Sequence, residues 1–362
     1  MPNYYLVVDV GGTKILAAAL DEQGRILARH KLKTDRQGRE GLLEQLDFAL
    51  EALLKAANLS KNEISGLALG VPGVVDSARG YVVLTPNAPL TDTPLREILA
   101  KKWSCPIIVG NDVNVGMAGE MRCGAARGAS SAFGIFVGTG IGGGLFLDGK
   151  LVEGFRGLAG EIGHLILPLG ADGNEILAGK NQLFLEDLCS RTAIENQLRA
   201  SIIKDGKKSA LTDILGDKKL ERIRSGSLKE ALKREDPLVI ETLRRASNLL
   251  GLATASMIHV VDPEVVIFGG GVIEACGKWM VPWIEKTVQK VAMPGTGKPI
   301  RIVQSTLGDD AILLGGLAML QDQAGLVSTL VAPSKNGKSG GKAALASVDK
   351  PLESGKLESG KF

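Results

Sequence analysis

The chain has few aromatic residues, few cysteines and no excess of charge of either sign. Phe, Trp and Tyr make up 4% of its 362 residues, and 43 basic residues nearly balance 40 acidic ones. This balance argues against a nucleic-acid partner, because proteins that bind nucleic acid usually carry a basic stripe. The four cysteines are far apart and form no C-x-x-C pair, which is typical of reduced thiols in a cytoplasmic protein.

Long apolar runs are missing as well. No run reaches the roughly 18–20 residues of a membrane-spanning helix, and Asp9 and Lys14 interrupt any N-terminal signal segment. We therefore expect a cytoplasmic protein without a membrane partner. From about residue 324 onward Ser, Gly, Lys and Pro dominate, which predicts a disordered tail over residues 324–362.

Glycine, by contrast, is abundant, with 47 residues. Three glycine-dense turns each follow a short apolar run that is predicted to be a strand. The turns are residues 11–14, 138–144 and 269–271. Glycine lets backbone N–H groups approach an anion closely, so a strand followed by such a turn is typical of phosphate binding. Three of them in one chain indicate a nucleotide site.

The order of predicted elements repeats along the chain. Three strands and a hairpin turn at residues 21–24 are predicted within residues 4–33, followed by a helix at 41–57 and strands at 64–69 and 107–109. A similar order restarts at residue 133 and includes a long helix at 237–260, with Asp236 as its N-cap. Duplicated α/β halves of this kind place a ligand in the cleft between them.

One glycine turn matches the dinucleotide-binding fingerprint as a string, Gly138-x-Gly140-x-x-Gly143. That fingerprint must open a helix and be followed by an acidic residue about 20 residues later. Here the next segment, residues 145–152, reads as a strand hairpin. The sequence therefore argues against a Rossmann dehydrogenase.

Several polar residues at the predicted cleft are candidates for catalysis or substrate binding. Asn111 and Asp112 follow a strand end, which is typical of an Asx turn and also of a carboxylate that acts as a general base. The position of Asp112 between the two halves favours the base. Glu161 and His164 form a Glu-x-x-His pair that suits metal binding, hydroxyl binding or packing. His259 lies in a long apolar helix and is predicted to be a core residue.

Together these motifs resemble the ROK family (repressor, open reading frame, kinase) within the sugar kinase–Hsp70–actin superfamily. The resemblance covers about residues 4–323. The matching segments are residues 9–14, 70–73, 85–87, 111–120, 138–144, 160–164, 186–190, 263–271 and 308–311. It implies an α/β fold of two domains, duplicated and ribonuclease H-like, with a cleft between the domains. The expected domains are residues 1–110, completed by a helix at 306–323, and residues 111–305.

The resemblance also implies roles for individual residues. Asp112 would be the catalytic base, and Asp9 would hold Mg²⁺. The sugar hydroxyls would be bound by a set of five side chains, Asn87, Asn111, Glu161, His164 and Glu186. ATP and its phosphates would be bound at the glycine turns and the residues beside them, namely Asp9, Gly11, Gly12, Thr13, Lys14, Gly138, Thr139, Gly140, Gly142, Gly270 and Gly271.

The chain departs from the family pattern at the zinc motif C-x-C-G-x-x-G-C-x-E. When the final Glu is aligned with Glu186, three cysteine positions hold Leu177, Gly179 and Phe184. A tetrahedral zinc site needs four ligands, so we expect no zinc and a loop at residues 170–183 that is ordered by packing.

The expected function is ATP-dependent phosphorylation of a hexose at its 6-hydroxyl, with glucose as the first candidate and a homodimer as the assembly. N-acetylhexosamines, mannose and fructose stay open as substrates, and polyphosphate as donor. A sugar sensor without catalysis is a further alternative. Sensors of this family carry a winged helix before the first strand, and here that strand is expected to start at Tyr4.

Overall fold

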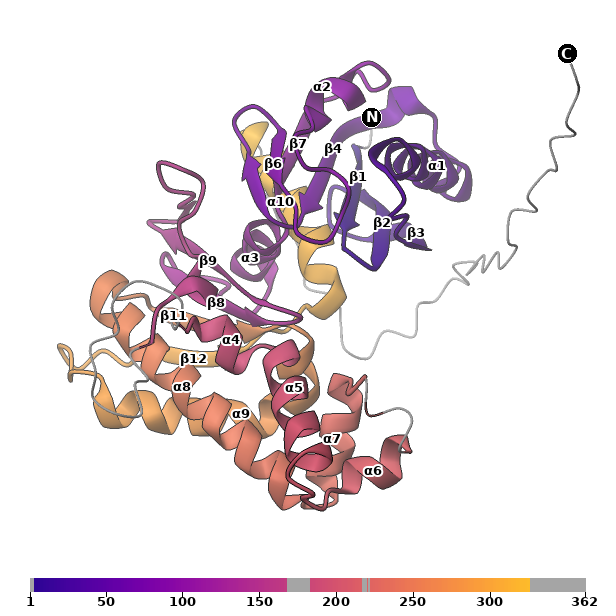
Figure 1. Ribbon diagram of the computed structural model, residues 1–362. Helices are drawn as coiled ribbons and strands as arrows, with labels where there is room; N and C mark the ends of the chain where they lie inside the picture. Colours follow the sequence, from indigo (N-terminus) through magenta and orange to yellow (C-terminus); the bar gives the residue numbers. More distant parts are fainter. Residues whose placement is uncertain (1–2, 168–182, 217–219, 221, 326–362) are drawn as a thin grey trace, which may run out of the picture.

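The computed structural model describes residues 3–167, 183–216, 220 and 222–325. Two five-stranded sheets dominate it (Figure 1). The first has the strand order β3-β2-β1-β4-β7. Its strands are β1 (Tyr4–Val10), β2 (Lys14–Asp21), β3 (Ile26–Lys33), β4 (Ile64–Val71) and β7 (Ile107–Asn111). The strands β1, β2 and β3 form an antiparallel meander, while β1, β4 and β7 run parallel.

The second sheet repeats this plan in the order β10-β9-β8-β11-β12. Its strands are β8 (Ala132–Val137), β9 (Ile141–Leu147), β10 (Lys150–Leu151), β11 (Val265–Gly269) and β12 (Arg301–Gln304). Again the first three strands along the chain are antiparallel and the other pairings are parallel. A small two-stranded sheet, β5 (Val74–Asp76) with β6 (Tyr81–Leu84), extends from the first half.

The helices cover the two sheets. The first half carries α1 (Arg39–Ala57) and α2 (Leu95–Ala100), and α3 (Asp112–Cys123) lies between the two sheets and contacts both. The second carries α4 (Leu185–Cys189), α5 (Arg191–Ile203), α6 (Ala210–Leu215), α7 (Ser225–Lys233), α8 (Pro237–Val261) and α9 (Gly271–Val291). The final helix is α10 (Ala311–Gln323), which follows a short 3₁₀ turn, Gly308–Asp310. In the described residues no helix is long and apolar enough to cross a membrane.

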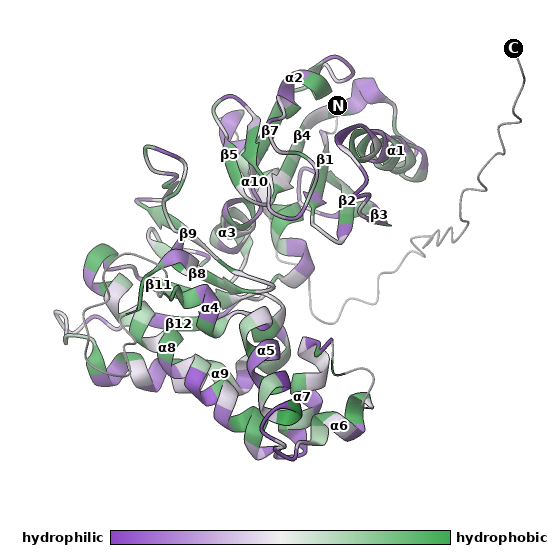
Figure 2. Cartoon of the chain, in the orientation of Figure 1, coloured by the Kyte–Doolittle hydropathy of each residue, from purple (hydrophilic) through white to green (hydrophobic). Residues whose placement is uncertain are grey.

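Helix α8 shows how local sequence sets an element. Asp236 caps it, since its Oδ1 accepts hydrogen bonds from the backbone N–H groups of Leu238 and Val239 at 2.9 and 3.0 Å. Pro237 occupies the first helical position, where a missing N–H costs nothing. The apolar residues of α8 and α9 face a large core under the second sheet, and Figure 2 shows that both helices carry hydrophobic and hydrophilic faces.

Two helices cross where the halves meet (Figure 1). Helix α3 contacts strands of both sheets and packs closely on α10. A Cβ atom added to Gly315 would lie 1.7 Å from the carbonyl oxygen of Val115, and one added to Gly119 would lie 2.3 Å from that of Ala311. Helix α10 returns to the first sheet, where Leu313 and its neighbours share a core with β1 and β4.

These observations confirm the predicted α/β fold with its repeated strand order. The hairpin after the second glycine turn is present as β9 and β10, which agrees with the exclusion of a Rossmann fold. The prediction for His259 is wrong, because this residue is exposed and its Nε2 accepts a hydrogen bond from the backbone N–H of Met293 at 2.9 Å. Residues 326–362 of the predicted tail lie outside the described residues.

Candidate active site

Two aspartates lie close together, one near the end of β1 and one at the start of α3. Asp9 is the penultimate residue of β1, and Asp112 is the first residue of α3. Burial raises the pKa of Asp9 to about 7, and the nearby carboxylates of Asp112 and Asp309 add to the shift while Lys14 opposes it. Like charges placed close together in a poorly solvated site favour the neutral form. The two aspartates therefore face a common space that would accept positive charge.

Asp112 is held in place by its own helix. Its Oδ1 accepts a hydrogen bond from the backbone N–H of Val113 at 2.9 Å. Burial raises the pKa of Asp112 to about 6, the backbone hydrogen bonds oppose that shift, and the carboxylate of Glu161 adds to it. A carboxylate with this pKa is ionised at neutral pH yet basic enough to accept a proton, which suits a general base.

The first glycine turn lies beside Asp9. The backbone N–H of Gly11 donates to the carbonyl of Lys14 at 2.9 Å, which closes the turn between β1 and β2. A Cβ atom on Gly12 would come within 2.6 Å of the Cβ of Asn87, so this turn packs directly on a predicted sugar-binding residue. Lys14 forms an ion pair with Asp309 at 2.8 Å.

The second glycine turn lies across from α3. It closes through the N–H of Gly138, which donates to the carbonyl of Gly140 at 2.9 Å. A Cβ atom on Gly142 would lie 2.6 Å from the side chain of Val113, so the turn sits against the residue that follows Asp112. Glu186 binds the same turn, because its Oε2 accepts from the N–H of Ile141 at 2.6 Å.

The third glycine turn adjoins the second. Gly270 has a φ of 82°, and a Cβ atom there would lie 2.7 Å from the carbonyl oxygen of Val137, the last residue of β8. Gly271 begins α9, and Glu274 in its first turn has a raised pKa because of burial and the carboxylate of Asp309. Asp309 thus links the third turn to Lys14 of the first.

The predicted hydroxyl-binding residues divide into two kinds. Asn111 is largely structural: its Oδ1 accepts from the N–H of Asn114 at 3.1 Å as the N-cap of α3, and its Nδ2 donates to the carbonyl of Gly73 at 3.0 Å. Glu161 and His164 are accessible, with Oε2 and Nδ1 3.5 Å apart. Glu161 is also the predicted site residue whose charge acts on Asp112.

The structure therefore brings the three glycine turns and the carboxylates of Asp9, Asp112 and Glu161 into one region. The sequence reasoning missed Glu274, Asp309 and Arg191 as members of this region. Asp309 lies within a segment that matched the family, and Glu274 follows the third glycine turn, so both positions carried a signal. Arg191 carried none, because only the fold brings it to the second turn.

The residues present fit a magnesium ion. Mg²⁺ prefers carboxylate oxygens and takes one or two of them together with phosphate and water. Asp9 and Asp112 offer such oxygens in a place where their charges repel each other. Of the three positions predicted to lack zinc-binding cysteines, Leu177 and Gly179 lie outside the described residues. Phe184 is described, and its ring centroid lies 5.5 Å from that of His164.

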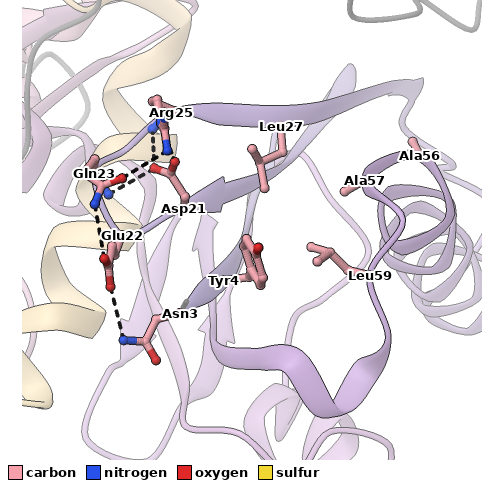
Figure 3. Close-up of a pocket in the computed structure, with 10 residues that line it drawn as sticks. All are labelled: Asn3, Tyr4, Asp21, Glu22, Gln23, Arg25, Leu27, Ala56, Ala57 and Leu59. Atoms are coloured by element: carbon pink, nitrogen blue, oxygen red, sulfur yellow. Dashed lines mark hydrogen bonds and ion pairs between the residues drawn. The ribbon is translucent and has the colours of Figure 1, made fainter. Parts of the chain in front are cut away.

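A surface cavity of about 380 Å³ lies elsewhere, at the edge of the first sheet beside the end of α1 (Figure 3). Tyr4, Leu27 and Leu59 form its apolar side, and Asp21 and Arg25 are paired on its polar side. None of the glycine turns or predicted site residues lines this cavity. The functional assignment therefore rests on the chemistry at the glycine turns and not on the size of a pocket.

Comparison with known proteins identifies the family of the chain. The model of the ROK family matches residues 5–323. A glucokinase from Halalkalibacterium halodurans is 31% identical over 323 residues, which cover 89% of this chain and 96% of that protein. A putative xylose repressor from Caldicellulosiruptor sp. is 28% identical over 282 residues, or 78% of this chain and 68% of the repressor.

A solved structure shows a similar fold over nearly the same range. The ROK family glucokinase from Streptomyces griseus, in complex with glucose and AMPPNP, superimposes with a TM-score of 0.72 at 30% identity. The match covers 88% of this chain and 99% of the other. The family match over residues 5–323 includes the strands of both sheets and all three glycine turns.

Proposed function

The chain belongs to the ROK family, and we propose that it is an ATP-dependent sugar kinase that phosphorylates a hexose, with glucose as the preferred substrate, at the 6-hydroxyl. The observation that carries this proposal is the position of Asp112. It lies next to Asp9 and Glu161 and beside the second glycine turn. A base at the junction of a carboxylate cluster and a phosphate turn suits phosphoryl transfer to a hydroxyl.

In the proposed reaction the 6-hydroxyl oxygen of the sugar attacks the terminal phosphorus of ATP. A new P–O bond forms as the bond to the β-phosphate oxygen breaks, and ADP leaves. The hydroxyl proton passes to the carboxylate of Asp112. Because the transition state of phosphoryl transfer is loose, this proton moves late, and most of the rate acceleration comes from alignment and charge stabilisation.

The glycine turns would supply that alignment. Backbone N–H groups of residues 11–14 and 138–142 would bind phosphate oxygens, and the third turn at Gly270 and Gly271 would lie near the adenosine. Asp9 would hold Mg²⁺, which when bound neutralises phosphate charge. The raised pKa of Asp9 supports this role, because a bound cation would relieve the repulsion among the carboxylates.

The sugar would lie on the Glu161 side of Asp112. Glu161 and His164 are accessible, which suits the binding of sugar hydroxyls. Glu186 would contribute its Oε1, because its Oε2 is occupied by the N–H of Ile141. Asn87 packs on the first turn and would place the sugar relative to the phosphates, and Asn111 would act mainly by fixing the start of α3.

The experiment that tests this function is a coupled kinase assay. Glucose, mannose, fructose, N-acetylglucosamine and N-acetylmannosamine would each be offered with ATP and with polyphosphate, in the presence of Mg²⁺. We expect turnover of glucose with ATP well above the other pairs. No turnover with any pair, combined with sugar binding in calorimetry, would contradict the kinase and favour a sugar sensor.

Two amide variants test the base. Asp112→Asn should lower kcat by roughly 10²–10⁴-fold, the usual contribution of a general base, while sugar binding persists. Asp148→Asn is the matched control, because Asp148 lies in the exposed β9–β10 turn with a φ of 50° that Asn tolerates. Near-normal turnover in the Asp112 variant would remove this residue from the mechanism.

The family resemblance supports two further parts of the proposal, a homodimer and the division into domains at residues 1–110 and 111–305, with a C-terminal helix completing the first. We also propose that the protein is cytoplasmic, and that it holds no zinc because Leu177, Gly179 and Phe184 occupy three cysteine positions of the family's zinc motif. Light scattering would test the dimer, and elemental analysis of purified protein would test the zinc content.

A further inference from the structure

The second glycine turn is clamped by the junction between α4 and α5. The backbone N–H of Arg191 donates to the carbonyl of Gly138 at 2.9 Å, and the hydroxyl of Thr192 donates to the carbonyl of Thr139 at 2.8 Å. These bonds fix the position of Arg191 at the turn through its main chain, independently of its side chain.

The guanidinium of Arg191 then folds over the turn. Its Nη2 donates to the hydroxyl of Thr139 at 2.6 Å. This bond uses one of the five N–H donors of the side chain. Among the described residues no carboxylate forms an ion pair with Arg191. A fixed guanidinium with spare donors therefore stands at the turn.

The other residues of the proposed nucleotide site include several carboxylates. Asp9, Asp112, Glu161 and Glu274 interact with one another or with Asp309 through their charges. Lys14, the cation of the first turn, is already paired with Asp309 at 2.8 Å. A nucleoside triphosphate adds further negative charge, which a cation besides Lys14 and the proposed Mg²⁺ would help to balance. Arginine suits this task, since its planar fork matches two oxygens of a phosphate group.

The position of the turn indicates which phosphate is involved. Gly142 packs on Val113, next to Asp112, and Asp112 is the proposed acceptor of the hydroxyl proton. The phosphate nearest to Asp112 must be the one that is transferred. We propose that Arg191 binds the terminal phosphate of the donor nucleotide and stabilises its charge during transfer. This inference rests on the proposed function, because it assumes that the second turn binds phosphate.

The test compares nucleotides that differ in their phosphates. Calorimetry would measure the binding of a non-hydrolysable ATP analogue, ADP and AMP to wild-type protein and to Arg191→Gln. We expect the variant to bind the ATP analogue about 10- to 100-fold more weakly, which is the effect of losing one or two charge-assisted hydrogen bonds, and to bind ADP and AMP nearly as wild type does. In the kinase assay kcat should fall as well, since the contact persists in the transition state.

Two further variants separate this role from a structural one. Thr192→Val removes a hydrogen bond that holds the turn in place and leaves the charge unchanged. It should weaken the binding of the ATP analogue and of ADP by a similar factor. Arg191→Lys keeps the charge and loses the fork, so its affinity for the ATP analogue should fall between wild type and Arg191→Gln. Arg191→Lys also keeps the inference testable if Arg191→Gln fails to fold, which a thermal melt would reveal.

The outcomes are distinct. If Arg191→Gln weakens the binding of the ATP analogue and of ADP equally, as expected for Thr192→Val, then Arg191 only stabilises the turn and the inference is wrong. The inference is equally wrong if Arg191→Gln binds the ATP analogue as wild type does. If wild-type protein binds none of the three nucleotides, the proposed function itself fails, and this inference fails with it.

Discussion

A buried carboxylate, that of Glu120, connects helix α3 with the segment that leads to helix α10. Glu120 on α3 is fully buried. Its Oε1 accepts hydrogen bonds from the hydroxyl of Ser305 at 2.6 Å and from the N–H groups of Leu307 and Thr306 at 3.0 and 3.1 Å. Its Oε2 accepts from the N–H of Ala125 at 2.7 Å. With the hydroxyl of Thr306, which donates to Oε2 at 3.4 Å, five donor groups depend on this one side chain, and four of them come from the segment that leads to α10.

Replacing Glu120 by Gln should therefore be costly although the shape is nearly unchanged. An amide must place an NH₂ group at one of the two oxygen positions. The less harmful orientation puts it at Oε2, where it faces the N–H of Ala125 and breaks that bond. A buried donor left without a partner costs about 1–3 kcal/mol, and a hydrogen bond to a charged group contributes about 1.5–3 kcal/mol. We expect a loss of about 2–4 kcal/mol for Glu120→Gln.

Truncation should cost more. Glu120→Ala leaves all five donor groups without this partner and adds a cavity, so the loss should be at least about 4 kcal/mol, in the range of the most damaging single substitutions. Urea unfolding followed by circular dichroism would measure both variants, with the slope checked against wild type.

The chain offers a matched control. Glu264 also accepts hydrogen bonds from two backbone N–H groups and a hydroxyl, those of Ser130 and Ser131, at 2.6–3.1 Å. This carboxylate is exposed, so water can replace it, and Glu264→Gln should change stability far less. If the two glutamine variants lose the same stability, the reasoning from burial is refuted.

Three further predictions concern the cleft and the helix crossing. In protein free of nucleotide and Mg²⁺, burial raises the pKa of Asp9 from 3.8 to about 7, so its ionised form destabilises the fold. Asp9→Asn should abolish turnover yet raise the melting temperature at pH 8, with the gain shrinking as pH falls from about 7 toward 4. Because the pKa of Asp112 is raised to about 6, log(kcat/KM) for the sugar should fall below pH 6 with a slope of about one, and a flat profile from pH 8 to 5 would contradict the assignment of the base. A Cβ on Gly315 would lie 1.7 Å from the carbonyl oxygen of Val115, so Gly315→Ala should strongly lower the yield of folded protein and the melting temperature of what is obtained. A Cβ on Gly295 would meet open space, so Gly295→Ala should match wild type in both measurements.

Much of this fold is visible in the sequence because its signals are local. Asp236 and Pro237 mark the start of α8, and the structure shows the cap and the first turn that they predict. The glycine turns were recognisable because each directly follows an apolar strand. Asp112 was recognisable for the same reason, as it comes at the end of β7.

The remaining features depend on partners that are distant in the sequence. Glu120 is hydrogen-bonded to Ser305, which is 185 positions away, and Arg191 to Thr139, which is 52 positions away. No local sequence pattern predicts either contact. His259 was predicted to be in the core because the residues around it are apolar. That pattern is misleading here, since neighbouring Val260 is itself 76% exposed. Helix α8 carries apolar residues on its outer face too, so hydrophobicity alone does not tell which side faces the core.

The arrangement of α3 holds the proposed base in place between the two halves. Asp112 begins this helix, and Glu120 fixes its other end to the segment that leads to α10. Between them, Val115 touches Gly315 of α10. A helix held at both ends and along its side moves as a rigid body. Asp112 is therefore held in a fixed position relative to α10 and the segment that leads to it. The first glycine turn belongs to the first sheet, and the second turn and Glu161 belong to the second half. The proposed base at the start of α3 therefore lies between the groups proposed to bind the phosphates and the sugar, which is the alignment that phosphoryl transfer requires.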